Sequence, residues 1–87
     1  MIYLTSTNES AIIAAEAMIS ANCGLPNSLG TMSWDSPPRK AVNQNLWFIC
    51  KPPVNGWGNA EQFTQAQMMS GVDMADIIEQ QYNPEWF

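Results

Sequence analysis

Residues 6–24 read STNESAIIAAEAMISANCG and carry the clearest structural signal in the chain. Ser6 and Glu9 have the spacing of a capping box, in which a hydroxyl and a carboxylate bind free backbone donors at the start of a helix. Asn8 is an alternative capping residue. The glycine that closes the stretch can adopt the left-handed conformation in which many helices end. The sequence therefore predicts a helix from this cap to about Cys23.

The predicted helix is apolar around most of its circumference, because alanine, isoleucine and methionine occupy most of its positions. Its polar residues Glu9, Glu16 and Ser20 share one narrow face. A helix of this kind is either enclosed by its own domain or covered on its outer side by a partner. Alanine side chains permit a close approach to a sheet, so we favour a helix that packs on a sheet.

Two segments that flank this helix have the pattern of strands. Residues 1–5 alternate and contain β-forming side chains, so they predict a first strand. Residues 46–50, LWFIC, are continuously apolar, which predicts a central strand covered on both faces. The amides at 43–45 suit a turn, because asparagine tolerates a positive φ, and they predict a hairpin with residues 39–42. One long strand over 40–51 is the alternative.

The C-terminal third predicts two short helices. Asn59 can cap a helix that runs to about Ser70, where Gly71 ends it. Asp73 then caps a last helix, in which apolar side chains from residues 74–82 lie on one face. Residues 26–38 contain proline and glycine and predict a long loop after the first helix, and residues 54–59 predict a second loop before the C-terminal helices.

Together these elements predict one α+β domain that spans residues 1–87. It contains a two- or three-stranded sheet, one well-capped N-terminal helix on one face, and two short C-terminal helices on the other face or at an edge. A hydrophobic content of 46% supplies enough core material for a chain of this length. Cys23 and Cys50 are too few for a disulfide scaffold, and we expect two buried thiols, with a single bridge as the alternative.

The charges are distributed unevenly along the chain. The three basic residues, Arg39, Lys40 and Lys51, all lie in one middle stretch. Every charged residue after Lys51 is acidic. The net charge of −5 argues against nucleic acid or an anionic membrane surface as a direct partner. No basic leader precedes the apolar start and no apolar run approaches the ~20 residues of a membrane span, so a cytoplasmic location is expected.

The residues that usually carry chemistry are scarce. The chain has no histidine, and two cysteines alone do not form a conventional zinc site. No glycine-rich phosphate loop is present. The carboxylates of Asp73 and Asp76 could act as a catalytic pair, but helix capping explains both. We therefore expect a protein without enzymatic activity, metal or cofactor.

A surface that is poor in charge and rich in amides and aromatic residues is typical of a protein interface. Trp34 is either a plug over the core or a contact residue. Acidic groups would steer the chain towards a basic surface, such as that of a nucleic-acid-binding protein. The residues predicted to bind a protein partner combine negative charge with aromatic anchors: Trp57, Asp73, Asp76, Glu79, Glu85, Trp86 and Phe87.

The C-terminal segment 83–87 is expected to project from the domain. Pro84 cannot continue the preceding helix and turns the chain outward. Trp86 and Phe87 would then anchor a partner, and deletion of the segment would weaken binding without unfolding the domain. The alternative is that Trp86 closes the core of the domain itself, in which case the deletion would unfold it.

In overall style the chain resembles the small accessory proteins of tailed bacteriophages. The features that carry this resemblance are the compact start MIYL at residues 1–4, the single β-α-β core and the acidic end NPEWF at residues 83–87. It extends over the whole chain as a style rather than a motif, and no functional residue is carried over. It implies either an inhibitor or modulator of a host protein, located in the host cytoplasm, or a minor virion component. A homo-oligomer, or a small-ligand binder with a pocket under Trp34 and Trp57, is an alternative.

Overall fold

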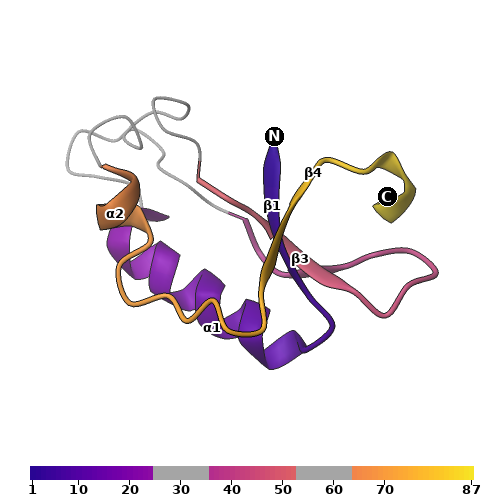
Figure 1. The fold of residues 1–87 in the computed structure, drawn as a ribbon, viewed down its shortest axis with the longest axis horizontal. Helices are drawn as coiled ribbons and strands as arrows, with labels where there is room; N and C mark the ends of the chain where they lie inside the picture. The colour runs from indigo at the N-terminus through magenta and orange to yellow at the C-terminus, as the bar shows by residue number, and fades with distance from the viewer. Residues whose placement is uncertain (25–35, 53–63) are drawn as a thin grey trace.

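The structure of the protein is a computed structural model that describes residues 1–24, 36–52 and 64–87. The loop tryptophans Trp34 and Trp57 lie outside these residues. Within them, one long helix packs on one face of an antiparallel sheet, and the C-terminal residues pack on the other (Figure 1). The predicted α+β class is confirmed.

The sheet has four strands in the order β2-β3-β1-β4, and every neighbouring pair is antiparallel. Strand β1 (Ile2–Ser6) lies in the interior between β3 (Trp47–Cys50) and β4 (Ile78–Gln81). The short β2 (Arg39–Lys40) forms the far edge. The sheet therefore has four strands, where the sequence predicted two or three.

Register gives the sheet two buried faces. Leu4 is opposite Ile49, and both side chains face helix α1 (Glu9–Ile19). One residue along, Tyr3 and Phe48 project to the opposite face, because successive side chains of a strand alternate. The prediction that residues 46–50 form a strand covered on both faces is confirmed.

Helix α1 starts at Glu9 and continues through a π-helical turn at Ser20–Gly24, which confirms the predicted helix. Its cap is Asn8, whose side-chain oxygen accepts the backbone N–H of Ser10 at 3.1 Å. Ser6 belongs to β1 and uses its hydroxyl to accept the backbone N–H of Asn8 at 2.9 Å. The alternative cap is therefore the one used.

The main core lies between α1 and the sheet. Ile12 and Ile19 are fully buried there, and each contributes about 1.5–3 kcal/mol by leaving water. The buried residues of this core come from the N-terminal helix, from β1 and β3, and from the chain between α2 and β4. They are Leu4, Ile12, Ala15, Ile19, Cys23, Ile49, Met68 and Ile77. A smaller cluster on the other face contains Ala41, Phe48 and Trp86.

The predicted hairpin is confirmed, and the single long strand is not formed. Asn43 adopts φ 62°, the positive value that asparagine tolerates. The backbone N–H of Ala41 donates to the carbonyl of Leu46 at 2.8 Å and closes the connection between β2 and β3.

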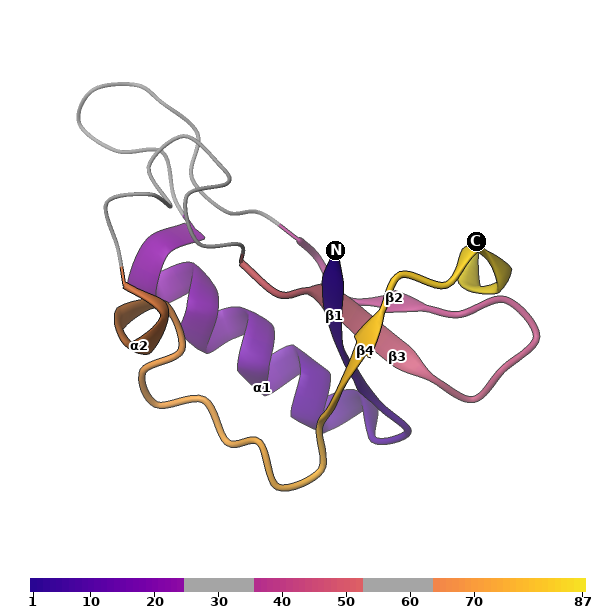
Figure 2. The same ribbon diagram turned by 45° about the horizontal axis from the view of Figure 1, so that its top comes forward.

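The predicted C-terminal helices differ from the structure. Helix α2 is confined to Gln65–Met68, where Thr64 forms a capping box with Gln67, and the predicted start at Asn59 lies outside the described residues. Gly71 ends this segment as expected, with φ 79°. Figure 2 shows the chain leaving α2 and running along α1 before it enters the sheet.

The predicted last helix is wrong, because Ile78–Gln81 forms strand β4. Asp73 caps only a turn, in which its carboxylate accepts the backbone N–H of Ala75 at 3.0 Å. The reason is the buried strand β1, whose backbone groups need partners on both sides. Pairing with β4 satisfies the second side, and the Thr5 hydroxyl adds a 2.8 Å hydrogen bond to the carbonyl of Ile78.

Candidate binding surface on helix α1

Trp86 is not the projecting anchor expected from the sequence. Pro84–Trp86 forms a 3-10 turn capped by Asn83, and Trp86 is only 2% exposed. Its ring packs on Phe48 with the centroids 5.2 Å apart. Trp86 therefore closes the smaller core cluster, as in the alternative considered above, and cannot serve as a partner contact in this conformation.

Phe87 remains on the surface and is 45% exposed. Its ring stacks on Tyr82 at 5.6 Å, and the guanidinium of Arg39 lies 5.0 Å from the ring centre. Together these groups form an amphipathic patch in which a cation, not a carboxylate, contacts the aromatic ring. The sequence predicted negative charge beside Phe87. The nearest acidic side chain along the chain is that of Glu85, whereas the charged group in contact with the ring is the guanidinium of Arg39.

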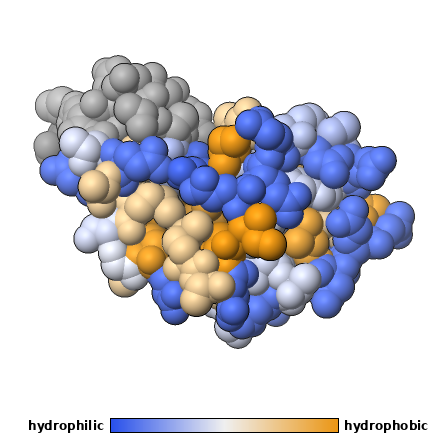
Figure 3. Space-filling view, in the orientation of Figure 1, coloured by the Kyte–Doolittle hydropathy of each residue, from blue (hydrophilic) through white to orange (hydrophobic). Residues whose placement is uncertain are grey.

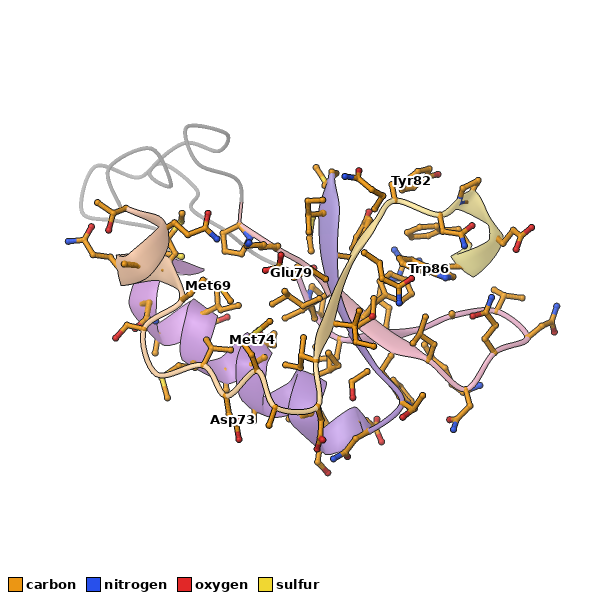
Figure 4. All side chains as sticks on the ribbon, viewed as in Figure 1. Met69, Asp73, Met74, Glu79, Tyr82 and Trp86 are labelled. Atoms are coloured by element: carbon orange, nitrogen blue, oxygen red, sulfur yellow. The ribbon has the colours of Figure 1, made fainter. Side chains whose placement is uncertain are left out.

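The predicted acidic residues do not form one cluster. Asp73 lies beside α1, whereas Tyr82 and Trp86 lie beyond β4 (Figure 4). Glu79, on β4, forms an ion pair with Lys51 at 2.7 Å. Glu85 sits in the C-terminal turn, and Trp57 lies outside the described residues. The structure thus separates the two aspartates from the C-terminal residues.

A different surface emerges on the outer side of α1. We call it the α1 face and define it by its exposed apolar residues: Ile13, Ala14, Ala17, Met18 and Ala21. The two largest, Ile13 and Met18, are 49% and 40% exposed. A helix whose inner side packs on a sheet normally places polar residues outside, so this apolar outer side requires an explanation.

The segment that follows α2 borders the α1 face. The side-chain amide of Asn22 donates to the carbonyls of Met68 and Ser70 at 3.0 and 2.9 Å, which holds one end of the segment on the helix. At the other end Asn8 donates to the carboxylate of Asp76 at 3.4 Å. The segment therefore runs antiparallel to α1 along its length (Figure 1).

This segment extends the apolar surface. Met69, Val72 and Met74 pack against the main core while remaining partly exposed. Figure 3 shows apolar atoms gathered in the region of α1 and this segment, with hydrophilic atoms around them. Figure 4 places Met69 and Met74 on the segment where it passes α1. The α1 face is thus continuous with a methionine-rich margin.

Carboxylates border the α1 face on both sides. Asp73 and Asp76 lie on the neighbouring segment, and both are exposed. Helical periodicity places Glu9 and Glu16 together at the opposite margin. Residues 1–24 and 64–87 contain no lysine or arginine, so no cation from these parts of the chain offsets them. The surface is apolar at its centre and negative at its rim.

The described residues offer little reactive chemistry. Cys23 and Cys50 are buried thiols rather than a disulfide, as predicted, and burial raises the pKa of each. A thiol held in the protonated form is a poor nucleophile. Within residues 1–24, 36–52 and 64–87, no group of three or more histidine, cysteine or acidic side chains is placed to hold a metal ion.

Similarity to known proteins does not assign a function. No family model matches this chain, and no curated protein or solved structure is significantly similar to it. Across the three described ranges, no helix has both the length and the apolarity needed to cross a membrane. Function must therefore be inferred from the surface itself.

The sequence contained part of the signal for the α1 face. The helix lacks charge at all positions except those of Glu9 and Glu16, which left a partner on its outer side as one of two alternatives. Which residues form that outer side depends on how the helix is rotated on the sheet. The contacts of Ile12, Ala15 and Ile19 with the core determine that rotation.

Proposed function

We propose that this protein is a non-catalytic protein-binding module that binds a basic partner through the α1 face. The observation that carries the proposal is an exposed apolar helix surface with unneutralised carboxylates on both margins. The partner that fits it has an apolar ridge or groove flanked by lysine or arginine side chains. The acidic rim would then steer association and make it sensitive to salt.

The shape of the surface supports a close contact. Ala14, Ala17 and Ala21 present little more than the backbone of the helix, which lets another main chain approach closely. Ile13 and Met18 stand higher and provide anchoring area, and methionine adapts to the shape of what it contacts. Burial of large apolar side chains at the centre of an interface usually supplies most of its affinity.

The resemblance to small phage accessory proteins would make the partner a host protein, with this chain as its inhibitor or modulator. A basic nucleic-acid-binding protein has the charge that the acidic rim requires.

The test uses site-specific photo-crosslinking in a bacterial lysate. A photoreactive side chain replaces Ala17 at the centre of the α1 face, and a matched control replaces Val42, which is 50% exposed on the distant hairpin. We expect one discrete adduct from position 17 at low salt, and no adduct from position 42. The adduct should weaken as the salt concentration rises towards 0.5 M.

Two variants separate specific binding from general adhesion. Ala17→Arg places a cation in the α1 face and should abolish the adduct formed from a photoreactive group at Ala14. Asp73→Asn with Asp76→Asn should reduce it and weaken its salt dependence. Equal capture by positions 17 and 42, or capture that Ala17→Arg leaves unchanged, would contradict the proposal.

A structural role, as a homo-oligomer or a minor virion component, is the second candidate. The observation that favours it is the exposed outer edge of β4, which presents backbone groups to a further strand. Mass spectrometry of purified particles would test the virion form.

A further inference from the structure

Among the described residues, no strand pairs with the outer edge of β4. β4 is the last strand of the sheet and pairs only with β1 among the described residues. The backbone N–H of Tyr82 donates to the carbonyl of Met1 at 3.0 Å, so Tyr82 turns its backbone groups towards β1. Because these directions alternate along a strand, Ile78 and Gln80 also face β1. The N–H and C=O groups of Glu79 and Gln81 therefore point outward.

This edge strand lacks two of the residues that most often protect sheet edges. Natural sheets protect their edges with charged side chains, lysine above all, and with proline, bulges, short strands or covering loops. β4 reads Ile-Glu-Gln-Gln and has no lysine or proline. Ile78 is 66% exposed, and Tyr82, directly after the strand, is 52% exposed. Ile78 is apolar and β-branched, and an exposed side chain of this kind on an edge strand favours pairing with a further strand.

The chain turns away from this edge at both ends of β4. Before β4, Asp76 contacts Asn8 at the start of α1, on one face of the sheet. After it, the C-terminal turn crosses the other face, where the backbone N–H of Val42 donates to the carbonyl of Trp86 at 3.1 Å. Neither connection pairs with the outer side of β4.

A second copy of the chain fits this edge in one favoured register. In a two-fold antiparallel pairing with the axis perpendicular to the sheet, a residue at the centre faces its own equivalent. Centring on Glu79 would place two carboxylates directly opposite each other, which is destabilising. Centring on Gln80 instead places Glu79 opposite Gln81 of the second copy. On the other face it places Ile78 opposite Tyr82 of the second copy.

We propose that two copies of this chain associate through the outer edges of β4, in an antiparallel pairing centred on Gln80. The outward backbone groups of Glu79 and Gln81 then form hydrogen bonds with Gln81 and Glu79 of the second copy. Ile78 and Tyr82 form an apolar cross-strand pair on one face. Glu79 keeps its ion pair with Lys51, so the pairing leaves no carboxylate without compensation.

The dimer is expected to be reversible. A single pair of short strands buries less than the roughly 1,200–2,000 Å² of a standard stable interface. The β4 edge and the α1 face share no residue, so substitutions on one surface test it without altering the side chains of the other. Failure of one proposal therefore leaves the other to be judged separately.

The test compares two substitutions at Gln81, an exposed position on the edge strand. Gln81→Lys places a cation opposite Glu79 of the second copy, whereas Gln81→Glu places a carboxylate there. Sedimentation equilibrium should show that the lysine variant dimerises about tenfold more tightly than the glutamate variant, since each dimer contains the contact twice. Ile78→Lys should abolish the dimer, and thermal melts should show that all three variants stay folded.

Amide hydrogen exchange gives a second readout that depends on the register. The amides of Glu79 and Gln81 should become protected as the concentration of the wild-type protein rises, whereas those of Gln80 and Tyr82 should be protected at every concentration. A chain that stays monomeric as both wild type and Gln81→Lys would overturn the proposal. So would a dimer whose Glu79 and Gln81 amides exchange freely, or one in which the two Gln81 variants have the same affinity.

Discussion

Trp86 and Phe48 pack together with their ring centroids 5.2 Å apart, and this contact attaches the end of the chain to the central strand β3. Tyr3 completes the cluster through edge-on contacts with both rings, at 5.5 and 5.6 Å. The carbonyl of Trp86 also accepts the backbone N–H of Val42. The C-terminal turn is therefore the cover of the second sheet face.

Removal of the Trp86 side chain should destabilise the whole domain. Trp86→Ala, or deletion of residues 83–87, is expected to lower the free energy of unfolding by about 3–5 kcal/mol, because a buried indole leaves a cavity against Phe48. Urea denaturation followed by circular dichroism measures the loss. The control is Phe87→Ala, whose half-exposed ring should cost much less. A deletion variant that melts at the wild-type temperature would disprove the covering role.

Gly71 is required by both its backbone angle and its surroundings. Any residue at this position has to adopt φ 79°, and its Cβ would lie 3.2 Å from the sulfur of Met18. Gly71→Ala should therefore cost about 1–2 kcal/mol, mainly from the left-handed backbone. The double variant with Met18→Ala removes the close contact, so its extra cost over Met18→Ala alone isolates the backbone term. Equal stability of Gly71→Ala and wild type would exclude this strain.

The Asn8 cap joins helix α1 to the segment before β4. Asn8→Ala removes the acceptor for the Ser10 amide and the donor to Asp76, and should cost about 1 kcal/mol. Asn8→Ser keeps a capping oxygen and should recover most of the stability. Thermal melts of the wild type and the two variants measure the effect. Equal melting temperatures for Asn8→Ala and Asn8→Ser would contradict the capping role.

The two buried thiols should make stability fall at alkaline pH. Burial raises the pKa of Cys23 and Cys50 above the ordinary value of 9.0. Thiolates are therefore disfavoured in the folded protein, and the stabilising effect is complete below pH 9 and is lost as pH rises above it. The free energy of unfolding of Cys23→Ala should depend less on pH between 8 and 10 than that of the wild type. An identical dependence would contradict this assignment.

Local patterns were enough to predict α1 and the β2–β3 hairpin. A cap near Asn8, an apolar helix and a terminal glycine are encoded within residues 6–24, and the positive φ of Asn43 follows from its own side chain. The apolar run at 46–50 predicted a strand buried on both faces. The candidate site was predicted only in part, because Asp73 and Asp76 lie where partner contacts are proposed but Trp86 does not.

The sequence by itself determined the elements whose hydrogen bonds close within a few residues: the helix, its cap and the hairpin turn. Only the tertiary structure decided that Ile78–Gln81 forms a strand and that Trp86 is buried. Their partners, Thr5 in β1 and Phe48 in β3, are distant in the chain, and the gain from pairing with a buried strand outweighs a local helical preference. The same reason holds for the α1 face. The helix is apolar around most of its circumference, and contact with the sheet selects which apolar side remains exposed.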